Sequence, residues 1–351
     1  MKTLFFAALG FGAALAFALD AAASAGPAAS DSAAGSSDSN RSGTAPHANR
    51  GIFAPARGLI HPLIDVDVAL QRKEPWVLDL ESESKNLVNT LKNEGLVDSV
   101  SIEFAGIEKT AQFDVNPDLK FKPASMVKLP IMIAFLKHRD NEREILNRRL
   151  TLQAMPPNPF TPEFPPKRRL PVGKEYSVNE LLEAMISRSD NDAAYTLVNS
   201  MEPGELSHIY EDLGVSGPEA RNPNALVTVR DLSTFLRILY VAGYLDWDLS
   251  QQAMEYLAAA DFKEGLSALL PPGTTVAQKF GEARDADLGL TQVHDCGFIF
   301  HPKGPYMLCV LTRGKDQHQQ AQAIARISKL VYDDIDKDFA DRNAPEASPP
   351  K

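Results

Sequence analysis

Strand-like alternation of apolar and polar residues occurs near both ends of one region of this chain, and a long helical stretch separates the two groups. The alternating segments are residues 97–107, 111–116, 274–283, 291–300 and 306–314. Helical spacing of apolar residues dominates between them, from about 124 to 260. We therefore predict an α+β domain in which an antiparallel sheet of about five strands, assembled from both chain ends, is flanked by helices and carries an inserted all-helical subdomain. A cleft between these parts is the expected place for a functional site.

The two ends of the chain lack the composition of a packed domain. Residues 1–25 combine a basic start, an apolar stretch and small residues at 23–25, which is the pattern of a cleaved signal peptide. An uncleaved anchor is the weaker alternative, because the apolar stretch is shorter than the roughly 20 residues of a membrane span. Residues 26–58 are interpreted as a flexible Ala/Ser/Gly/Pro-rich linker and 341–351 as a disordered tail. We expect an exported protein, periplasmic or secreted, with one domain at 59–340 and no stable membrane span after cleavage.

Composition and residue spacing exclude several functions. The chain has 351 residues, 44% of them hydrophobic, and its net charge of -10 disfavours nucleic-acid binding. The seven histidines show no metal-binding spacing such as H-E-x-x-H, and two cysteines cannot form a cysteine-ligated zinc site, so no metal or other cofactor is expected. Cys296 and Cys309 flank an apparent hairpin. A disulfide and two free buried thiols both remain open, because a two-residue register slip would separate the side chains.

A serine three residues before a lysine, Ser125 and Lys128, opens the apolar run "SMVKLPIMIAFL". In the first turn of a buried helix the serine would lie near unpaired backbone N–H groups, and a partly buried, neutral Lys128 on the same face could act as its general base. The alternative is an ordinary helix start with a lysine that reaches the surface. Pro130 lacks the N–H of a helix interior, so we expect a local kink there. The same spacing at Ser82 and Lys85 lies in a charged stretch, where nothing would activate a hydroxyl.

Two further short motifs follow. Ser189-Asp190-Asn191 interrupts two helical segments and, taken alone, is typical of a helix break in which Asp or Asn caps the next helix. Lys279 and Gly281 share one face of a predicted strand, where a lysine is usually solvated. The order S-x-x-K, S-D-N, K-x-G is much rarer than any of its parts.

In this order the three motifs resemble those of the penicillin-binding and class A β-lactamase superfamily of serine acyl-transfer enzymes. The resemblance spans roughly residues 60–335. "SMVKLPIMI" is similar to the nucleophile helix of that superfamily, "TVRDLSTFLRILY" to its helix after the Ω-loop, and "HDCGFIFHP" to its strand after the lysine strand. The resemblance implies a β-lactamase/transpeptidase-like fold and a reaction that passes through an acyl-enzyme.

The resemblance also implies a role for each catalytic residue. Ser125 would attack a carbonyl carbon, and Lys128 would take the serine proton directly or through water. Ser189 would pass that proton to the leaving nitrogen. Acyl transfer needs a nucleophile, a base and an acid, and these three side chains supply them.

Four other residues are implied in substrate binding. Asn191 would hold the amide side chain of the substrate, and Lys279 would attract its carboxylate. The oxyanion hole would use the backbone N–H groups of Ser125 and of Glu282, the residue after Gly281.

Two positions depart from the class A pattern. In those enzymes an Ω-loop glutamate activates the water for deacylation and an asparagine follows four residues later. Here Glu219 is the only carboxylate of the corresponding stretch before Asp231, and Asn222 is three residues on, so a solvated loop glutamate is the favoured interpretation. Phe280 stands in the K-x-G motif where the family has Thr or Ser, which removes a hydroxyl that would hydrogen-bond a substrate carboxylate.

The leading hypothesis is an exported serine hydrolase that is acylated at Ser125 by β-lactams and hydrolyses their amide bond. One alternative is a penicillin-binding D,D-peptidase that acts on peptidoglycan stem peptides. A second alternative is a cell-wall binding module without turnover. The sequence leaves the oligomeric state open.

Overall fold

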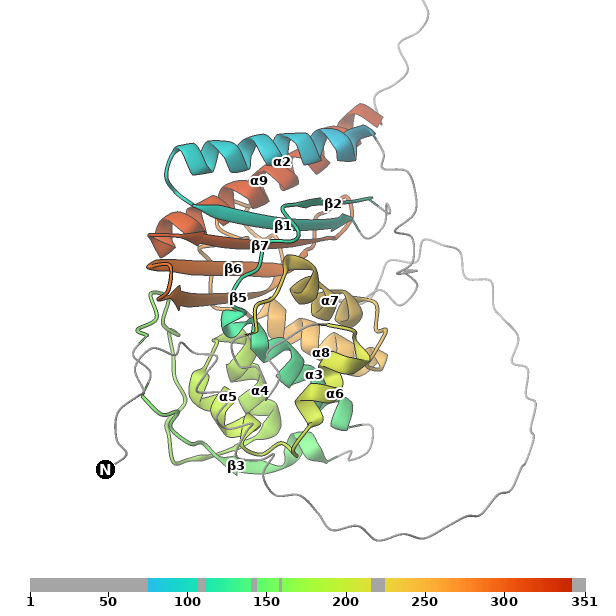
Figure 1. Ribbon diagram of the computed structural model, residues 1–351. Helices are drawn as coiled ribbons and strands as arrows, with labels where there is room; N and C mark the ends of the chain where they lie inside the picture. Colours follow the sequence, from blue (N-terminus) through green and yellow to red (C-terminus); the bar gives the residue numbers. More distant parts are fainter. Residues whose placement is uncertain (1–74, 107–110, 140–143, 158–159, 216–224, 343–351) are drawn as a thin grey trace, which may run out of the picture.

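The computed structural model describes residues 75–106, 111–139, 144–157, 160–215 and 225–342. Its main sheet is antiparallel, with the strand order β2-β1-β7-β6-β5 (Figure 1). The strands are β1 Ser99–Gly106, β2 Ala111–Val115, β5 Val276–Asp285, β6 Leu290–Ile299 and β7 Tyr306–Gly314. Strands from the two ends of the domain meet where β1 pairs with β7. The predicted α+β fold with a five-stranded sheet from both chain ends is confirmed.

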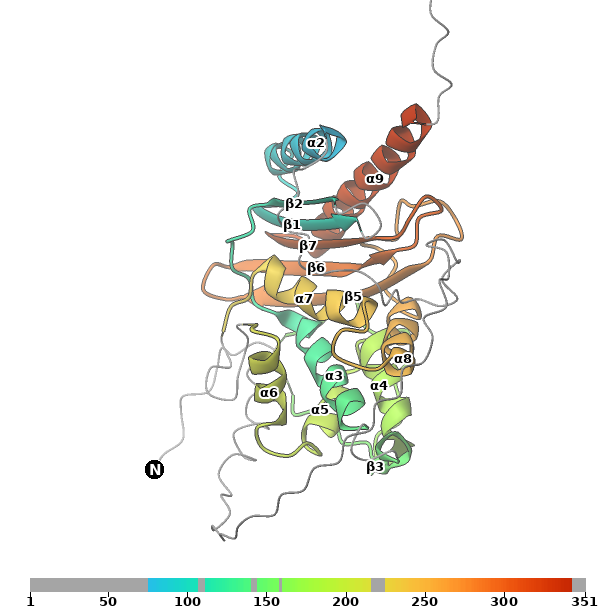
Figure 2. The same cartoon turned by 90° about the vertical axis from the view of Figure 1, so that its right-hand side faces the viewer.

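Helices cover both faces of this sheet. Helix α2 (Pro75–Asn93) lies beside α9 (Gln317–Arg342) on one face, and α7 (Val229–Tyr240) packs on the other (Figures 1 and 2). Alternate residues of β7 therefore enter different cores: Leu308 and Val310 pack toward α2 and α9, whereas Met307 and Leu311 pack with the helical part. Because both faces are covered, β7 is buried along nearly its whole length.

The inserted part packs on one face of the sheet through α7 and extends beyond the edge strand β5 (Figure 1). Its elements are η2 Ala124–Val127, α3 Lys128–His138, η3 Ile145–Asn147, α4 Val178–Ser187, α5 Asn191–Val198, α6 Glu205–Asp212, α7 and α8 Trp247–Ala258. Helix α3 is buried along most of its length and packs against its neighbours from all sides. The inserted part also contains a small antiparallel pair, β3 (Arg149–Thr151) and β4 (Glu175–Ser177), so it is not all-helical as the sequence predicted.

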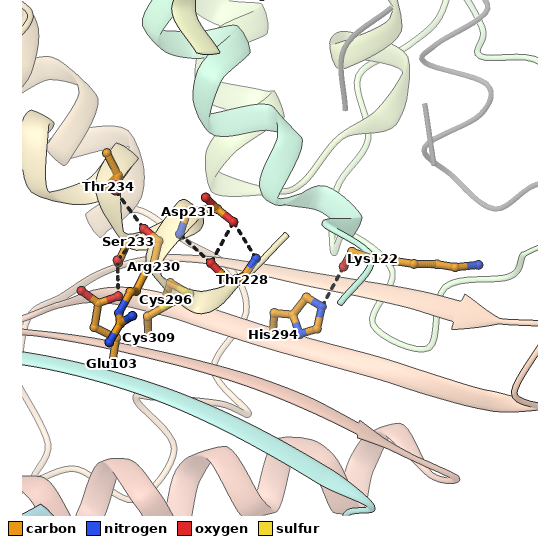
Figure 3. The surroundings of a disulfide bond; sticks show 10 residues. All are labelled: Glu103, Lys122, Thr228, Arg230, Asp231, Ser233, Thr234, His294, Cys296 and Cys309. Carbon is orange, nitrogen blue, oxygen red and sulfur yellow. Dashed lines mark hydrogen bonds between the residues drawn. A yellow bond between two sulfur atoms is a disulfide. The ribbon is translucent and has the colours of Figure 1, made fainter. Parts of the chain in front are cut away.

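The two cysteines form a disulfide bond, which decides the alternative that the sequence left open. Cys296 of β6 is directly opposite Cys309 of β7, and their Cα atoms are 3.9 Å apart (Figure 3). The register slip that would have kept the thiols apart does not occur.

The predicted signal peptide, linker and almost all of the predicted tail lie outside the described residues. Among the helices that are described, none has the length and apolar content to cross a membrane.

Candidate active site

Ser125 lies in η2, the short 3-10 helix that leads directly into α3, and Lys128 is the first residue of α3. Ser125 is 8% exposed and Lys128 is fully buried, so the surface-lysine alternative is wrong. Because the α-helix begins only at Lys128, Pro130 lies in its first turn. An N–H there has no intrahelical acceptor, so Pro130 fits the helix start, whereas we had expected it inside the helix, where it would cause a kink.

The second serine-lysine pair, at residues 82 and 85, is exposed to solvent, as the sequence predicted. Ser82 and Lys85 lie in α2, both exposed, and Lys85 Nζ donates to Glu81 2.7 Å away. Spacing alone therefore does not produce the arrangement found at Ser125.

Ser189 lies between α4 and α5, and the helix-break interpretation of its motif is confirmed. Asp190 caps α5 by accepting from the backbone N–H of Ala193 at 2.9 Å, as a helix break requires. Ser189 itself has a φ of 54°, in the left-handed region that non-glycine residues rarely adopt. This unusual backbone coincides with a side chain that contacts Lys128 and Lys279, and strained positions often occur at functional sites.

Three distant segments converge on two amino groups. Lys128 Nζ lies 3.2 Å from Ser125 Oγ, 3.1 Å from Ser189 Oγ and 2.8 Å from the Ser189 carbonyl oxygen. It also donates to Asn191 Oδ1 at 2.6 Å. Lys279 Nζ, from β5, lies 3.0 Å from the same Ser189 Oγ. The structure thus brings together the side chains of Ser125, Lys128, Ser189, Asn191 and Lys279, all named from the sequence.

Gly281 brings the edge strand against the nucleophile. A Cβ at this position would lie 3.0 Å from the backbone nitrogen of Ser125 and 3.1 Å from the Ala124 Cβ. Only glycine therefore fits without displacing the segment that carries Ser125. This places the backbone of Glu282, the next residue, beside the same serine.

The two lysines have unusual electrostatics for amino groups. Burial lowers the pKa of Lys128 well below the ordinary value of 10.5, and the neighbouring charge of Lys279 lowers it further. Burial also lowers the pKa of Lys279 to about 7, against the opposing effects of Asp295 and Glu282. A neutral amine next to a serine hydroxyl is what a general base requires.

A cavity of about 210 Å³ opens above these groups. Ser125, Ser189 and Asn191 line it, together with a wall of proline and aromatic side chains from residues 155–166. Phe280 also lines it and stacks on Phe262 with ring centroids 4.2 Å apart. Lys279 is only 1% exposed and is not among the lining residues, so the sequence prediction that it attracts a substrate carboxylate would rely on an amino group that does not reach the cavity surface.

Two carboxylates near the site were not singled out from the sequence. Asp295 of β6 is fully buried, accepts from the backbone N–H of Leu266 at 2.9 Å, and has its pKa raised to about 7 by burial. Gly265 leaves room for it, since a Cβ there would overlap the Asp295 carboxylate. The carboxylate of Glu282 is also buried and accepts backbone N–H groups of the wall. The sequence offered one signal for both: an acidic residue at an inward or edge position of an otherwise buried strand.

Some expected features cannot be placed. Glu219 and Asn222 lie outside the described residues. In the described part of the chain, no group of three or more His, Cys, Asp or Glu side chains is arranged to hold a metal ion.

The family model described as the β-lactamase enzyme family matches residues 79–335, which include every residue of this site. The chain belongs to that family. No curated protein matches it at a significant level. Among solved structures, an acyl-enzyme complex of PBP-A with penicillin G is similar, at 24% identity and a TM-score of 0.61 over 76% of this chain and 100% of the other.

Two β-lactamases of known structure are similar to this chain to about the same degree as PBP-A. The TLA-1 extended-spectrum β-lactamase has 22% identity and a TM-score of 0.59, covering 72% of this chain and 99% of its own. A β-lactamase from Chitinophaga pinensis has 21% identity and a TM-score of 0.60, covering 72% and 98%. At such identities these likenesses support the fold, and the chemistry has to be argued from the site itself.

Proposed function

We propose that the protein is an exported serine hydrolase that forms an acyl-enzyme at Ser125 with β-lactams and hydrolyses the β-lactam amide. The observation that carries the proposal is the position of one buried amino group, Lys128 Nζ, within 3.2 Å of both Ser125 Oγ and Ser189 Oγ. Export rests on the signal-peptide pattern of residues 1–25. A mature chain that begins at Gly26 after expression in a bacterium would support it.

In the proposed reaction, Ser125 Oγ attacks the carbonyl carbon as its proton moves to the neutral amine of Lys128. The C–N bond then breaks, and the nitrogen leaves with a proton delivered by the Ser189 hydroxyl. Ser189 regains a proton from Lys128, with which it shares a 3.1 Å contact. Lys279, 3.0 Å from the same hydroxyl, favours its transient negative form. The product is an ester at Ser125 that water can hydrolyse.

The geometry of β5 supports the proposed oxyanion hole. β5 is the edge strand, and the carbonyl oxygen of Phe280 accepts from Lys279 Nζ at 2.6 Å, so this peptide group is turned away from β6. Backbone groups alternate along a strand, so the N–H of Glu282, two residues on, is turned the same way. A Cβ built at Gly281 would lie 3.0 Å from Ser125 N, so the two proposed donors belong to neighbouring backbone segments, which supports a shared oxyanion hole.

The remaining roles follow from position. Asn191 lines the cavity and is fixed by its 2.6 Å contact with Lys128, which suits a group that holds an amide side chain of the substrate. Lys279 is buried and does not line the cavity, so its attraction for a substrate carboxylate would act without direct contact. Its closer partner is Ser189.

A second candidate is a penicillin-binding D,D-peptidase, in which the acyl-enzyme with β-lactams is long-lived. One observation favours it: the carboxylates that line the described cavity, Asp190, Asp192 and Glu282, each accept a backbone N–H group already. Each carboxylate therefore has an oxygen that is already hydrogen-bonded to the backbone, so it is less suited to accept a proton from a water in the deacylation step.

Labelling experiments test both candidates. The mature protein is incubated with a fluorescent penicillin and, separately, with a chromogenic cephalosporin. We expect covalent labelling that Ser125→Ala abolishes and Ser82→Ala leaves intact. Rapid cephalosporin turnover supports hydrolysis, and turnover lost in Glu219→Gln would identify that residue as the base. A persistent adduct supports the peptidase. No labelling by any β-lactam contradicts both candidates and leaves the binding module or an esterase with another acyl substrate.

A further inference from the structure

The proline-rich segment, defined here as residues 152–157 and 160–171, is fastened to the helical side of the cleft at one end. The backbone N–H of Gln153 donates to Thr196 Oγ1 at 2.9 Å, and that of Met155 donates to Asp192 Oδ1 at 2.8 Å. Both acceptors belong to α5, the helix that begins at Asn191. This end of the segment therefore moves with the helix that carries part of the site.

Further along, the segment is fastened to the sheet by one carboxylate. Glu282 Oε2 accepts from the backbone N–H of Glu163 at 2.9 Å, and Oε1 accepts from that of Phe164 at 3.3 Å. Gln317 Nε2, at the start of α9, donates to the same carboxylate at 2.7 Å. Glu282 is 8% exposed, and burial raises the pKa of its carboxyl. A buried carboxylate is costly unless donors surround it, and three donors do so here.

An aromatic cluster adds to this attachment. Phe164 is 9% exposed and makes edge contacts with Phe262, Phe280 and His318, with ring centroids 5.1, 6.4 and 5.0 Å away. Phe280, the residue that replaces the family's Thr or Ser, thus supports the segment. Phe280 and Glu282, both on β5, thus each contact the proline-rich segment.

We propose that Glu282 is a positioning residue that fixes the proline-rich segment across the cleft, so that the cavity over Ser125 admits only acyl donors with a compact acyl group. This inference rests on the proposed function. The segment lines the cavity mainly with rigid or aromatic side chains, among them Pro156, Phe160, Pro162 and Phe164, and with one charged side chain, Arg169. The volume of about 210 Å³ is below the roughly 300–1,000 Å³ of typical ligand pockets.

The first test measures the attachment without any substrate. In Glu282→Gln, one of the two oxygens becomes an NH₂ group that faces backbone donors. We expect amide hydrogen exchange at residues 160–164 to accelerate by about tenfold or more, as for a segment that opens locally. Glu103→Gln is the matched control, because Glu103 is a buried glutamate of the same sheet that contacts Ser233 and Arg237 and does not line the cavity. Unchanged exchange in a folded Glu282→Gln protein overturns the inference.

The second test measures selectivity. Second-order acylation rate constants are compared for 6-acetamidopenicillanic acid and for a penicillin with a diphenylacetyl side chain. We expect the wild-type preference for the compact compound to fall by about tenfold in Glu282→Gln and to stay unchanged in Glu103→Gln. Asp192→Ala removes the acceptor that holds the other end of the proline-rich segment, so it should also lower the preference for the compact compound. This variant replaces Glu282→Gln if Glu282→Gln does not fold.

The outcomes separate the two proposals. The proposed role of Glu282 is overturned if Glu282→Gln and Asp192→Ala react with both compounds at the wild-type ratio of acylation rate constants. It is also overturned if Glu103→Gln changes that ratio as much as Glu282→Gln does. Failure of the wild-type protein to react with any β-lactam overturns the proposed function instead. In that case the exchange measurement still decides whether Glu282 holds the segment.

Discussion

Two buried charged clusters lie at opposite ends of the part of one residue row that runs from β1 across β7 and β6 to β5. The strand register aligns Glu103 of β1 with Cys309, Cys309 with Cys296, and Cys296 with Lys279 of β5. Residues directly opposite each other point to the same face, so all four side chains face the helical part of the domain. At one end Glu103 contacts Ser233 and Arg237 of α7, and at the other Lys279 contacts Ser189.

The clusters differ in how their charges are balanced. Glu103 lies 2.8 Å from Arg237 and accepts from Ser233, so burial raises its pKa while the guanidinium opposes that rise (Figure 3 shows Glu103 and Ser233). At the other end two amino groups share one hydroxyl, and the charge of Lys279 lowers the pKa of Lys128. Opposite charges hold the sheet to a helix, whereas like charges destabilise each other's charged form and leave a reactive amine.

The largest effect that we expect is the fall of the acylation rate constant in Lys128→Met, which tests the contrast between the two clusters. Without the amine, Ser125 loses its proton acceptor, so the acylation rate constant should fall by about 10²- to 10⁴-fold. Met has a similar length and carries no charge to bury, so the free energy of unfolding should not decrease. Stopped-flow labelling with a fluorescent penicillin and urea unfolding measure the two quantities.

Lys85→Met is the control for this prediction, because Lys85 has the same spacing to a serine but is exposed. Its acylation rate should equal that of the wild type. A Lys128→Met rate within tenfold of the wild type would remove Lys128 from the mechanism and break the contrast between the clusters.

At the other end, Glu103→Ala should show the reverse pattern. The substitution leaves Arg237, which is 29% exposed, without its carboxylate, and it removes the acceptor of Ser233. We expect the free energy of unfolding to fall by about 3 kcal/mol, at the lower end for broken buried pairs because Arg237 partly reaches solvent. The acylation rate of the folded protein should stay within about twofold of the wild type. A loss of acylation as large as the one expected for Lys128→Met would show that the two ends of the row are coupled.

The disulfide lies between the clusters, and its removal tests whether they are mechanically linked. In Cys296→Ala/Cys309→Ala the bridge over a sequence separation of 13 is lost, and we expect about 2 kcal/mol of destabilisation. Pairing of β6 with β7 continues on both sides of the bridge, so acylation should be unaffected. Urea unfolding of the variant, and of the wild type with and without reductant, gives the first quantity. An acylation rate that falls on reduction would contradict the separation.

The sequence predicted what local patterns determine. Alternation at the chain ends gave the five-stranded sheet, and the three motifs gave the residues that meet at Lys128. It left open the pairing of Cys296 with Cys309, because pairing depends on register. It expected Pro130 inside a helix, whereas the α-helix starts only at Lys128, after a 3-10 turn, and Pro130 lies in its first turn. Nor could it show that the Glu282 side chain holds a loop 118–119 residues away along the chain, since that contact exists only once both sides of the cleft have folded.

The smallest expected effect is a shift in the pH dependence of acylation, and it tests the like-charge cluster most directly. Acylation needs neutral Lys128, so the rate should rise with pH through the titration of the coupled lysine pair. The charge of Lys279 lowers the pKa of Lys128, so Lys279→Met should raise that pKa and move the midpoint of the acid limb to higher pH. The midpoint is compared rather than the plateau, because losing the 3.0 Å contact with Ser189 also lowers the maximum rate. Glu103→Gln, at the far end of the row, should leave the midpoint in place. A midpoint that stays fixed or moves to lower pH in Lys279→Met would mean that burial alone tunes Lys128, and the contrast between the clusters would then rest on desolvation rather than on the sign of the neighbouring charge.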